Sequence, residues 1–348
     1  MKTRKQHLIE RLTNHFNFIY IEPYKKNEHI YYNNNVDNII VYTIPTFKLG
    51  SKILGLIFNF HIIRKIIFLF QKLYLKKIIN NKIDVQIISN PSFIQLINKN
   101  IPIIWDYNDN PFQFAKPPNW LYKSFESFLF TKINKIWASS KYLNDKFNNK
   151  NFTDVDYIPN GVDIDFGKNV KKIYKKDFTI GYVGIISSWF FDFELIKSIS
   201  IQFPNIIIRL IGPKDPLAQK KIKELYKFKN ISIEEKVDYS DLPEIMSSFN
   251  IGIIPLKQMK SVYQLNSAKI LQYLAVGIPV ISVPFFEFKE FKDGVYFCNS
   301  NIQYINSIKE IIKDKAELKS NNINLENFYW GKISNNAQKS ISNLIKKT

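Results

Sequence analysis

The fold of this 348-residue chain is decided by one stretch of sequence, Asn266-Ser267-Ala268-Lys269-Ile270-Leu271-Gln272-Tyr273-Leu274-Ala275-Val276-Gly277-Ile278-Pro279-Val280-Ile281. The stretch predicts a loop, a short helix, a stop and a buried strand. Gly277 suits the position just past a helix end, and Pro279 prevents the helix from continuing. A helix followed at once by an apolar strand is typical of an α/β chain.

The start of this helix is a candidate binding site for an anion. A helix N-terminus offers free N–H groups and the positive end of the helix dipole, which together suit a diphosphate. Lys269 lies in the first turn and adds a positive charge, and Gln272 follows three residues later on the same side. By helix spacing alone, an ordinary amphipathic helix without a ligand is the better interpretation.

Outward from this stretch, short apolar runs alternate with longer amphipathic segments, which indicates parallel sheets covered by helices. The strands expected in the first half are 18–21, 39–42, 85–88, 103–105, 136–138 and 155–158, and those in the second half are 179–184, 206–211, 231–234, 251–254, 280–282 and 294–297. The expected helices are 5–15, 52–80, 92–98, 119–132, 140–148, 192–201, 216–227, 241–248, 267–275, 302–314 and 331–346.

The two halves meet at Ile158-Pro159-Asn160-Gly161-Val162-Asp163, which a lysine-rich stretch follows as far as Lys176. Proline, Asn-Gly and a run of charge mark a turn and a linker. The sequence therefore predicts an N-terminal domain over 1–160, a linker over 161–178, a C-terminal domain over 179–328 and a final helix over 329–348 that returns to the first domain. The expected fold class is α/β, with two Rossmann-like domains facing across a cleft.

Composition excludes several classes of protein. An apolar fraction of 45% and an aromatic fraction of 15% exclude global disorder. The single cysteine, Cys298, excludes a disulfide framework and a cysteine-based zinc cluster. No two of the four histidines have the spacing of metal ligands, so we expect no metal. We also expect no signal peptide and no membrane span.

The net charge is 49 − 30 = +19, which favours anionic partners. Four of the 49 basic residues are arginines and the other 45 are lysines. The chain is also rich in Asn and Ile, a bias typical of AT-rich coding that weakens any argument from one lysine. The basic residues are dispersed and form no known RNA- or DNA-binding motif, so we expect no nucleic-acid partner.

The segment 53–79 is a candidate membrane-surface helix. From Asn38 to Ile83 there is no acidic residue but there are eight basic ones. Lys65, Lys72 and Lys76 share a helical face, and Arg64 adjoins them. A basic amphipathic helix without acids suits an anionic membrane surface. A domain helix packed on a sheet is the alternative, and the two interpretations are compatible.

Asp106 and Asp109 follow a buried strand at the edge where the sites of α/β proteins lie. A carboxylate there suits a general base, with Asp109 the first candidate and Asp106 the second. The alternative is that Asp106-Tyr107-Asn108-Asp109 forms only a turn. Arg209 precedes Gly212-Pro213 and is a candidate for the diphosphate, although strand alternation equally allows a solvent-facing role.

Six segments in order resemble those of GT-B glycosyltransferases of glycosyltransferase family 4. The 266–281 stretch resembles their Asn-Pro-x-Lys-x-x-Glu-Tyr-Leu-Ala-x-Gly-x-Pro-Val-Val motif. Others are Arg4-Lys5-Gln6-His7-Leu8, Trp105-Asp106-Tyr107-Asn108-Asp109, Pro159-Asn160-Gly161-Val162-Asp163, Gly181-Tyr182-Val183-Gly184 and Val237-Asp238-Tyr239-Ser240-Asp241-Leu242-Pro243.

This resemblance implies transfer of a sugar from a nucleotide diphosphate sugar to a cell-surface glycan or lipid-linked acceptor, without a cofactor or metal. The donor-binding residues that it implies, together with Arg209, are Lys269, Gln272, Asn266, Ser267, Gly184 and Gln264. The acceptor or membrane side is expected to include Arg64, Lys65, Lys72 and Lys76. The expected location is the cytoplasmic face of the plasma membrane.

Two departures from the family pattern keep alternatives open. The family usually carries Glu-x7-Glu, whose second Glu binds the donor ribose, whereas Gln264 and Gln272 stand here. An amide still hydrogen-bonds ribose hydroxyls, but the stereochemistry is left open. The family's opening strand is also missing, so we expect either an upstream start or a sheet without that strand. The alternatives are a sugar-nucleotide 2-epimerase of this fold and a catalytically inactive GT-B scaffold.

Overall fold

The computed structural model describes residues 2–23, 38–44, 60–78, 82–108, 121, 123, 125, 127–128, 131–149, 154–168, 170, 177–289, 291, 293–314 and 324–347. They form two compact units. The C-terminal unit comprises Met1–Thr3, Ser140–Leu143 and Pro159–Ile333, and the N-terminal unit comprises Arg4–Ser139, Asn144–Ile158 and Ser334–Thr348.

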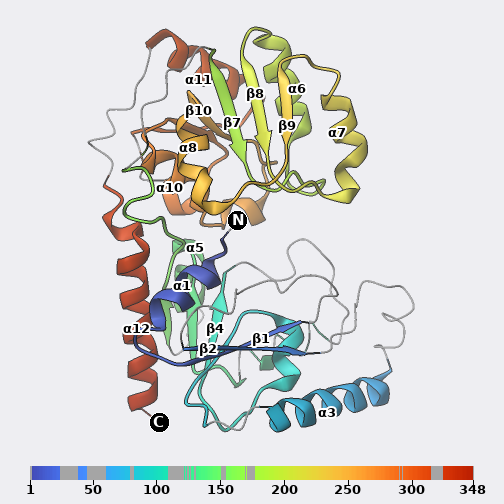
Figure 1. Ribbon diagram of the computed structural model, residues 1–348, viewed down its shortest axis with the longest axis vertical. Coiled ribbons are helices and arrows are strands. Elements are labelled where there is room, and N and C mark those ends of the chain that lie inside the picture. The colour runs from blue at the N-terminus through green and yellow to red at the C-terminus, as the bar shows by residue number, and fades with distance from the viewer. Residues whose placement is uncertain are drawn as a thin grey trace. The chain divides into compact units, whose positions relative to one another are not determined.

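A six-stranded parallel sheet forms the centre of the C-terminal unit (Figure 1). Its order is β12-β11-β10-β7-β8-β9. The strands are β7 (Thr179–Val183), β8 (Ile207–Ile211), β9 (Ile231–Glu234), β10 (Ile251–Ile254), β11 (Val280–Ser282) and β12 (Val295–Phe297). The order runs outward in both directions from β7 and β10, as in a doubly wound Rossmann sheet. Both faces are covered, which explains why these strands are continuous apolar runs.

Helices cover both faces of this sheet. One core cluster joins the sheet to α6 (Phe193–Gln202), α7 (Gln219–Leu225) and α11 (Asn301–Asp314). The other joins it to α8 (Leu242–Ser247), α9 (Lys260–Tyr263) and α10 (Ala268–Ala275). Single turns of 3-10 helix lie at η2 (Pro216–Ala218), η3 (Tyr239–Asp241), η4 (Phe286–Phe288) and η6 (Glu326–Phe328). Gly277 has φ +77°, which confirms the stop expected after α10.

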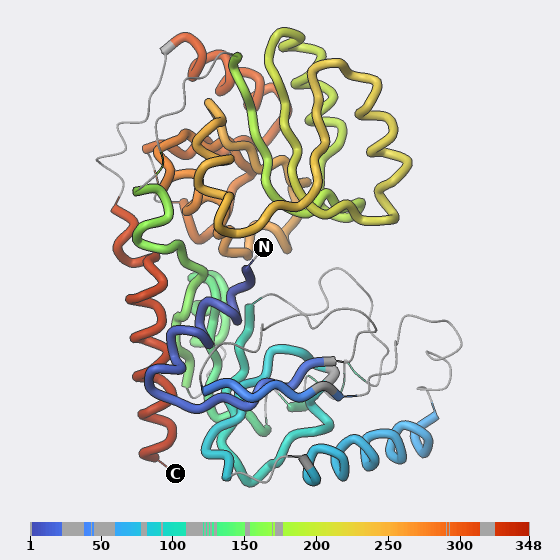
Figure 2. The backbone as a smooth tube through the Cα atoms, viewed as in Figure 1, coloured from blue at the N-terminus to red at the C-terminus, as the bar shows by residue number. Residues whose placement is uncertain are grey.

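The N-terminal unit contains two parallel sheets among its described residues. The larger has the order β3-β4-β5-β6, and β1 and β2 form a separate pair that lies side by side (Figure 2). In chain order, this part of the structure begins with α1 (Arg4–Leu12), β1 (Phe18–Pro23), β2 (Ile39–Ile44), α3 (His61–Ile78), β3 (Gln86–Ile88) and η1 (Pro91–Leu96). The chain continues through β4 (Ile103–Tyr107), β5 (Lys135–Ala138), α5 (Lys141–Asn148) and β6 (Val155–Tyr157).

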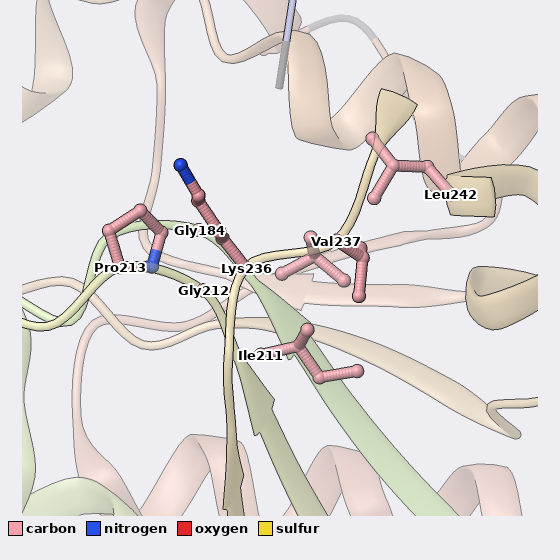
Figure 3. A pocket seen from close by; sticks show the side chains of 8 residues that line it. Gly184, Ile211, Gly212, Pro213, Lys236, Val237 and Leu242 are labelled. Atoms are coloured by element: carbon pink, nitrogen blue, oxygen red, sulfur yellow. The ribbon is translucent and has the colours of Figure 1, made fainter. Parts of the chain in front are cut away.

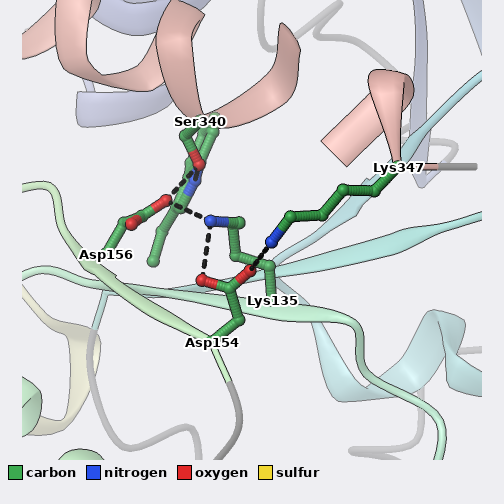
Figure 4. A network of polar contacts seen from close by, with 6 residues as sticks. Lys135, Asp154, Asp156, Ser340 and Lys347 are labelled. Carbon is green, nitrogen blue, oxygen red and sulfur yellow. Dashed lines mark hydrogen bonds and ion pairs between the residues drawn. The ribbon is translucent and has the colours of Figure 1, made fainter. Parts of the chain in front are cut away.

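The last helix, α12 (Trp330–Lys346), is joined to β5 and β6 by a polar network (Figure 4). Lys135 Nζ donates to Asp154 at 2.8 Å and to Asp156 at 2.7 Å. Ser340 of α12 donates its hydroxyl to Asp156 and accepts a hydrogen bond of 2.7 Å from Trp137 Nε1. Burial alone would lower the pKa of Lys135, but hydrogen bonds to Asp154 and Asp156 outweigh it and raise that pKa. The ammonium is therefore held charged.

The expected α/β class with parallel sheets is confirmed, and each expected strand is present within one or two residues of its predicted bounds. The helix expected over 92–98 is a 3-10 helix, Pro91–Leu96. The parts expected as helix at 52–59 and 79–80, and much of 119–132, lie outside the described residues. Among the described helices, none is long and apolar enough to cross a membrane. The expected domain boundaries stay a prediction.

Candidate active site

The strand order of the C-terminal unit predicts where its ligand binds. In a doubly wound sheet, ligands bind outside the carboxyl ends of the strands, at the point where the order reverses. Here that point lies between β7 and β10, which pair in parallel. Gly184 follows β7 directly, and its N–H donates to the Ile211 carbonyl at 2.9 Å. The site is therefore sought around Gly184.

Helix α10 begins beside this point with polar groups that have no partner among the described residues. Ser267 occupies the N-cap position in an extended conformation, but its side chain makes no capping hydrogen bond. Asn266 is buried, and neither its side-chain oxygen nor its nitrogen has a recorded partner in the described structure. Its backbone carbonyl accepts 2.8 Å from Asn160 Nδ2, which fixes the turn. Unpaired buried polar atoms are costly, so they point to a ligand.

The side chain of Lys269 reaches from α10 to the backbone of Gly184. A β-carbon placed on Gly184 would lie 2.5 Å from Lys269 Cε, so the position admits only glycine without a shift. Burial lowers the pKa of Lys269, and in the described part of the chain no carboxylate pairs with its ammonium. A half-buried cation without a counter-charge favours binding of an anion there.

Tyr273 holds α10 in this position. Its hydroxyl donates to the Gly181 carbonyl at 3.1 Å and accepts from the Val183 N–H at 3.0 Å. Burial raises the pKa of Tyr273, so the hydroxyl stays protonated and can donate. Because Tyr273 lies one helical turn after Lys269, these bonds fix where Lys269 stands relative to β7. Tyr273 belongs to the motif that resembles the family's, but the sequence alone does not mark its hydroxyl as the group that positions α10.

The two glutamines that replace the family's glutamates are both described. Gln272 of α10 is 7% exposed, and Gln264 ends α9 and is half-buried. For the part of the chain that the structure covers, no hydrogen bond is recorded for either side-chain amide. Their amides are therefore open to a ligand's hydroxyl groups.

Two hollows lie at the carboxyl edge of the sheet. The first is shallow, with a cavity volume of about 10 Å³, and is lined by Val183, Gly184, Ile211, Gly212, Pro213, Lys236, Val237 and Leu242. Lys236 and Pro213 lie on one side of it and Val237 and Leu242 on the other (Figure 3). The second, with a cavity volume of about 330 Å³, is lined by Gln258, Met259, Lys260, Val262, Tyr263, Val283, Pro284 and Asn299. Gln264 follows directly after that lining loop.

The loop between β7 and α6 is held rigidly and exposes a tryptophan. Asp215 accepts hydrogen bonds from the Ser188 hydroxyl at 2.7 Å and the Ser188 N–H at 3.1 Å. The Ser188 hydroxyl is the main cause of a lowered Asp215 pKa. Lys257 Nζ donates to the Ser188 and Trp189 carbonyls at 3.0 Å each. The Trp189 side chain is 53% exposed on this hydrogen-bonded loop, five residues after Gly184 in the chain.

Arg209 is engaged away from this site. Its Nε and Nη2 atoms donate to the two carboxylate oxygens of Glu234 at 2.8 and 2.7 Å, and its guanidinium lies 5.5 Å from the centre of the Phe249 ring. The Glu234 hydrogen bond raises the pKa of Arg209. The guanidinium is thus already neutralised by the neighbouring strand, and the geometry does not support its expected contact with a diphosphate.

Asp106 lies at the end of β4 in the N-terminal unit and is buried in an ion pair. Its Oδ1 accepts from Arg4 Nε at 3.1 Å and from Arg4 Nη2 at 3.0 Å. A carboxylate held in this way stabilises α1 against β4 and is not a free base. The geometry therefore does not support Asp106 as the general base. The first candidate, Asp109, lies outside the described residues and stays a prediction.

The basic residues assigned to the acceptor or membrane side lie on α3. Lys65, Lys72 and Lys76 are exposed, and Arg64 is half-buried with Nη2 3.1 Å from His61 Nδ1. Within the described part of the chain, no group of three or more His, Cys, Asp or Glu side chains is placed to hold a metal ion. No metal is assigned to the site.

No family model matches the sequence. A curated relative, assigned as the teichuronic acid biosynthesis glycosyltransferase TuaH of Bacillus subtilis, is 26% identical over 168 residues, which cover 46% of this chain and 42% of that protein. The match therefore spans less than half the length of the relative.

Solved structures match over almost the whole chain. Sucrose-phosphate synthase from Thermosynechococcus elongatus has a TM-score of 0.61 and 13% identity, over 98% of this chain and 88% of that one. HepE from Anabaena, in complex with UDP and glucose, has a TM-score of 0.60 and 13% identity, over 98% of this chain and 93% of that one. The chain has the GT-B fold, and the expected resemblance to GT-B glycosyltransferases is confirmed.

Proposed function

We propose that this protein is a glycosyltransferase that moves a sugar from a nucleotide diphosphate sugar to a glycan or lipid-linked acceptor of the cell envelope. The observation that carries the proposal is the half-buried Lys269 ammonium, which stands at the start of α10 against Gly184 and has no carboxylate partner among the described residues. The curated relative is assigned by name as a glycosyltransferase, and HepE was solved with UDP and glucose.

The proposed donor site uses the groups around α10. The diphosphate binds Lys269 and the free N–H groups at the start of the helix. Asn266 and Ser267 supply the unpaired polar atoms beside it, and Gln272 holds the ribose in place of the usual glutamate. The shallow hollow beside Gly184 has an apolar lining with one lysine, and it offers a surface for one edge of the nucleotide rather than an enclosed pocket. We leave Arg209 out of this site.

The second hollow is assigned to the sugar end of the donor. It adjoins the loop that ends at Gln264, and its lining combines two amides, Gln258 and Asn299, with the ring of Tyr263. Amides pair with sugar hydroxyls, and an aromatic ring covers the apolar face of a pyranose. Lys260 in the same lining would favour a sugar or phosphate that carries negative charge.

The proposed reaction joins an acceptor hydroxyl oxygen to the anomeric carbon of the donor sugar. The bond from that carbon to the β-phosphate oxygen breaks, and the nucleoside diphosphate leaves with the electron pair. Lys269 and the α10 N–H groups stabilise the charge that develops on the phosphate, so the proposal needs neither metal nor cofactor. The acceptor proton goes to Asp109 if the reaction inverts configuration, or to the leaving phosphate if it retains configuration.

We also propose a cellular location for the protein. We assign it to the cytoplasmic face of the plasma membrane, where it meets a lipid-linked acceptor. The net charge of +19 and the acid-free segment from Asn38 to Ile83 support an anionic membrane surface as a partner.

An inactive GT-B scaffold is the second candidate, because Gln264 and Gln272 replace two carboxylates at the donor site. Thermal unfolding with a panel of nucleotide sugars first tests whether the donor site binds. A ligand at 100 times its Kd adds about 2.7 kcal/mol of stability, so an active site raises Tm with a nucleoside diphosphate and further with one sugar conjugate. No shift with any member would overturn the donor site.

Product analysis then separates transfer from epimerisation. The stabilising donor is incubated with and without envelope lipid extract, and the nucleotide products are resolved by chromatography. Release of nucleoside diphosphate that depends on the extract supports transfer. Inversion at C2 of the sugar without any extract would instead identify a 2-epimerase. A donor that binds but stays unchanged in both arms would favour the scaffold.

A further inference from the structure

Helix α3 carries an apolar face that points away from the unit to which it belongs. The inward side contains Ile67, Gln71 and Leu75 at intervals of four residues, of which Leu75 is buried at 9% exposure. Helix α3 contacts η1, which follows β3. Residues at i, i+4 and i+8 lie along one side of a helix, so these three form the more buried stripe of α3.

The opposite side carries large apolar residues that remain in solvent, and the exposed Lys77 closes it one turn after Leu73. Residues at i, i+4, i+7, i+8 and i+11 lie on one helical face, and here they are Ile62 at 73% exposure, Ile66 at 48%, Leu69 at 56%, Phe70 at 68% and Leu73 at 55%. Soluble proteins rarely expose a contiguous apolar surface of this kind, so it marks an interaction site. The alternative that α3 buries its apolar side against a sheet is therefore not what the structure shows.

A row of lysines borders this apolar face. Lys65, Lys72 and Lys76 are exposed and share one edge of α3 at i, i+7 and i+11. No acidic residue occurs between Asn38 and Ile83, so nothing in that segment neutralises them. An apolar face beside a purely cationic edge is complementary to a bilayer interface, which offers acyl chains below and anionic headgroups above.

We infer that α3 lies in the interface of an anionic membrane, with Leu69, Phe70 and Leu73 inserted among the acyl chains and the lysine edge on the headgroups. A second copy of the chain suits this face less well. Pairing two such helices would bring two acid-free lysine edges together, whereas anionic lipids neutralise them. The inference rests on the faces of α3 and not on the proposed activity. It adds to that proposal the element and the side chains that hold the protein at the membrane.

Insertion predicts a dependence on salt that adsorption by charge alone would not show. Each lysine near an anionic surface strengthens binding about fivefold at low salt, and this part weakens as salt screens the charges. Burial of three large apolar side chains adds at least about a hundredfold, and salt does not screen it. Binding should therefore weaken in 0.5 M NaCl without vanishing.

Co-sedimentation of the full chain with vesicles tests the inference. We expect binding to vesicles of phosphatidylcholine with 30% phosphatidylglycerol and much weaker binding to phosphatidylcholine alone. The combined variant Leu69→Ser, Phe70→Ser and Leu73→Ser should lose at least about a hundredfold at both salt concentrations. The variant Lys65→Glu, Lys72→Glu and Lys76→Glu should lose at least about a hundredfold at low salt.

A matched variant controls for the change in net charge. Lys220→Glu, Lys223→Glu and Lys227→Glu alter three exposed lysines of the C-terminal unit by the same amount and should bind vesicles as the wild type does. Circular dichroism should be unchanged in all variants, because every altered side chain is exposed.

Three results would overturn the inference. They are a wild type that does not sediment, an apolar variant that sediments as the wild type does, or a concentration-dependent dimer that the apolar variant abolishes without any vesicle binding. The same preparations are tested with nucleotide sugars by thermal unfolding. Failure at the membrane with retained nucleotide binding would remove α3 and leave the proposed activity standing.

Discussion

Lys269 and Gly184 form one unit of structure, because the lysine side chain occupies the space where a side chain at position 184 would stand. A β-carbon on Gly184 would lie 2.5 Å from Lys269 Cε and 2.6 Å from the Tyr182 hydroxyl. Because Gly184 has no side chain, the Lys269 ammonium can reach the end of β7, where the strand order of the sheet reverses. Two residues that are 85 positions apart thus define the candidate anion site.

Lys269→Ala should weaken nucleoside diphosphate binding without unfolding the protein. Loss of a charge-assisted hydrogen bond to a diphosphate costs about 2–4 kcal/mol, which is about a thirtyfold to a thousandfold loss in affinity. Calorimetric titration with UDP measures it, and Lys223→Ala, an exposed lysine on α7, serves as the control. Unchanged UDP affinity in Lys269→Ala would remove this residue from the site.

Gly184→Ala should reproduce much of this loss, because the new methyl group displaces the Lys269 side chain. We expect at least about a tenfold weaker Kd for UDP, together with a small fall in Tm from the contact with the Tyr182 hydroxyl. Gly331→Ala on α12 is the control, since a β-carbon there meets nothing within 4 Å. A Gly184→Ala protein with wild-type affinity would show that Lys269 acts from another position.

Asp106→Asn should destabilise the N-terminal unit. The substitution removes the carboxylate charge that pairs with the buried Arg4 guanidinium, and breaking a buried ion pair costs about 3–5 kcal/mol. Thermal or urea unfolding measures the change. Asp84→Asn is the comparison, because Asp84 is 59% exposed and 4.0 Å from Lys82, a surface pair worth at most about 1 kcal/mol. Equal stability of the two variants would contradict the structural role.

Asp109→Asn should lower turnover while donor affinity and Tm stay unchanged. Removal of a general base typically costs about 10²–10⁴ in rate. The rate is measured with the donor and acceptor that the screen identifies, and the Kd of the donor is measured separately. Full activity in Asp109→Asn would leave no base at this position and would favour a retaining mechanism, in which the donor phosphate takes the proton.

The Arg209–Glu234 pair should make stability depend on pH in the acid range. The Arg209 hydrogen bond lowers the pKa of Glu234 below its ordinary value of 4.5. A carboxyl whose pKa is lower in the folded state stabilises the protein above its unfolded pKa, and this contribution is lost as pH falls through the folded pKa. Because both side chains are about one third exposed, screening limits the contribution to about 1 kcal/mol.

Comparison of the wild type with Glu234→Gln tests whether the contribution of this pair to stability falls as pH falls. We expect the wild type to be more stable at pH 6, with the difference in free energy of unfolding shrinking as pH falls from about 4.5 to 3. A difference that grows on acidification would contradict the assignment. Nucleotide affinity at pH 6 should be the same in both proteins if Arg209 lies outside the donor site.

The sequence by itself determined the order of strands and helices and the helix start that carries Lys269. Those features are local. Apolar runs, Gly277 and Pro279 act within a few residues, so each predicts a strand or a helix end without knowledge of which other segment packs against it. The doubly wound order also follows, since right-handed crossovers between parallel strands leave few topologies.

Only the tertiary structure decided which charged groups are already paired. Arg209 meets Glu234 25 positions later, and Arg4 meets Asp106 across 102 positions, so no local pattern marks either pair. The tertiary structure also decided which side of α3 faces solvent. A helical pattern shows that Leu69 and Leu75 lie on different faces, but not which face the rest of the unit covers. That depends on the neighbour that packs against the helix, and the structure leaves the face of Leu69 in solvent.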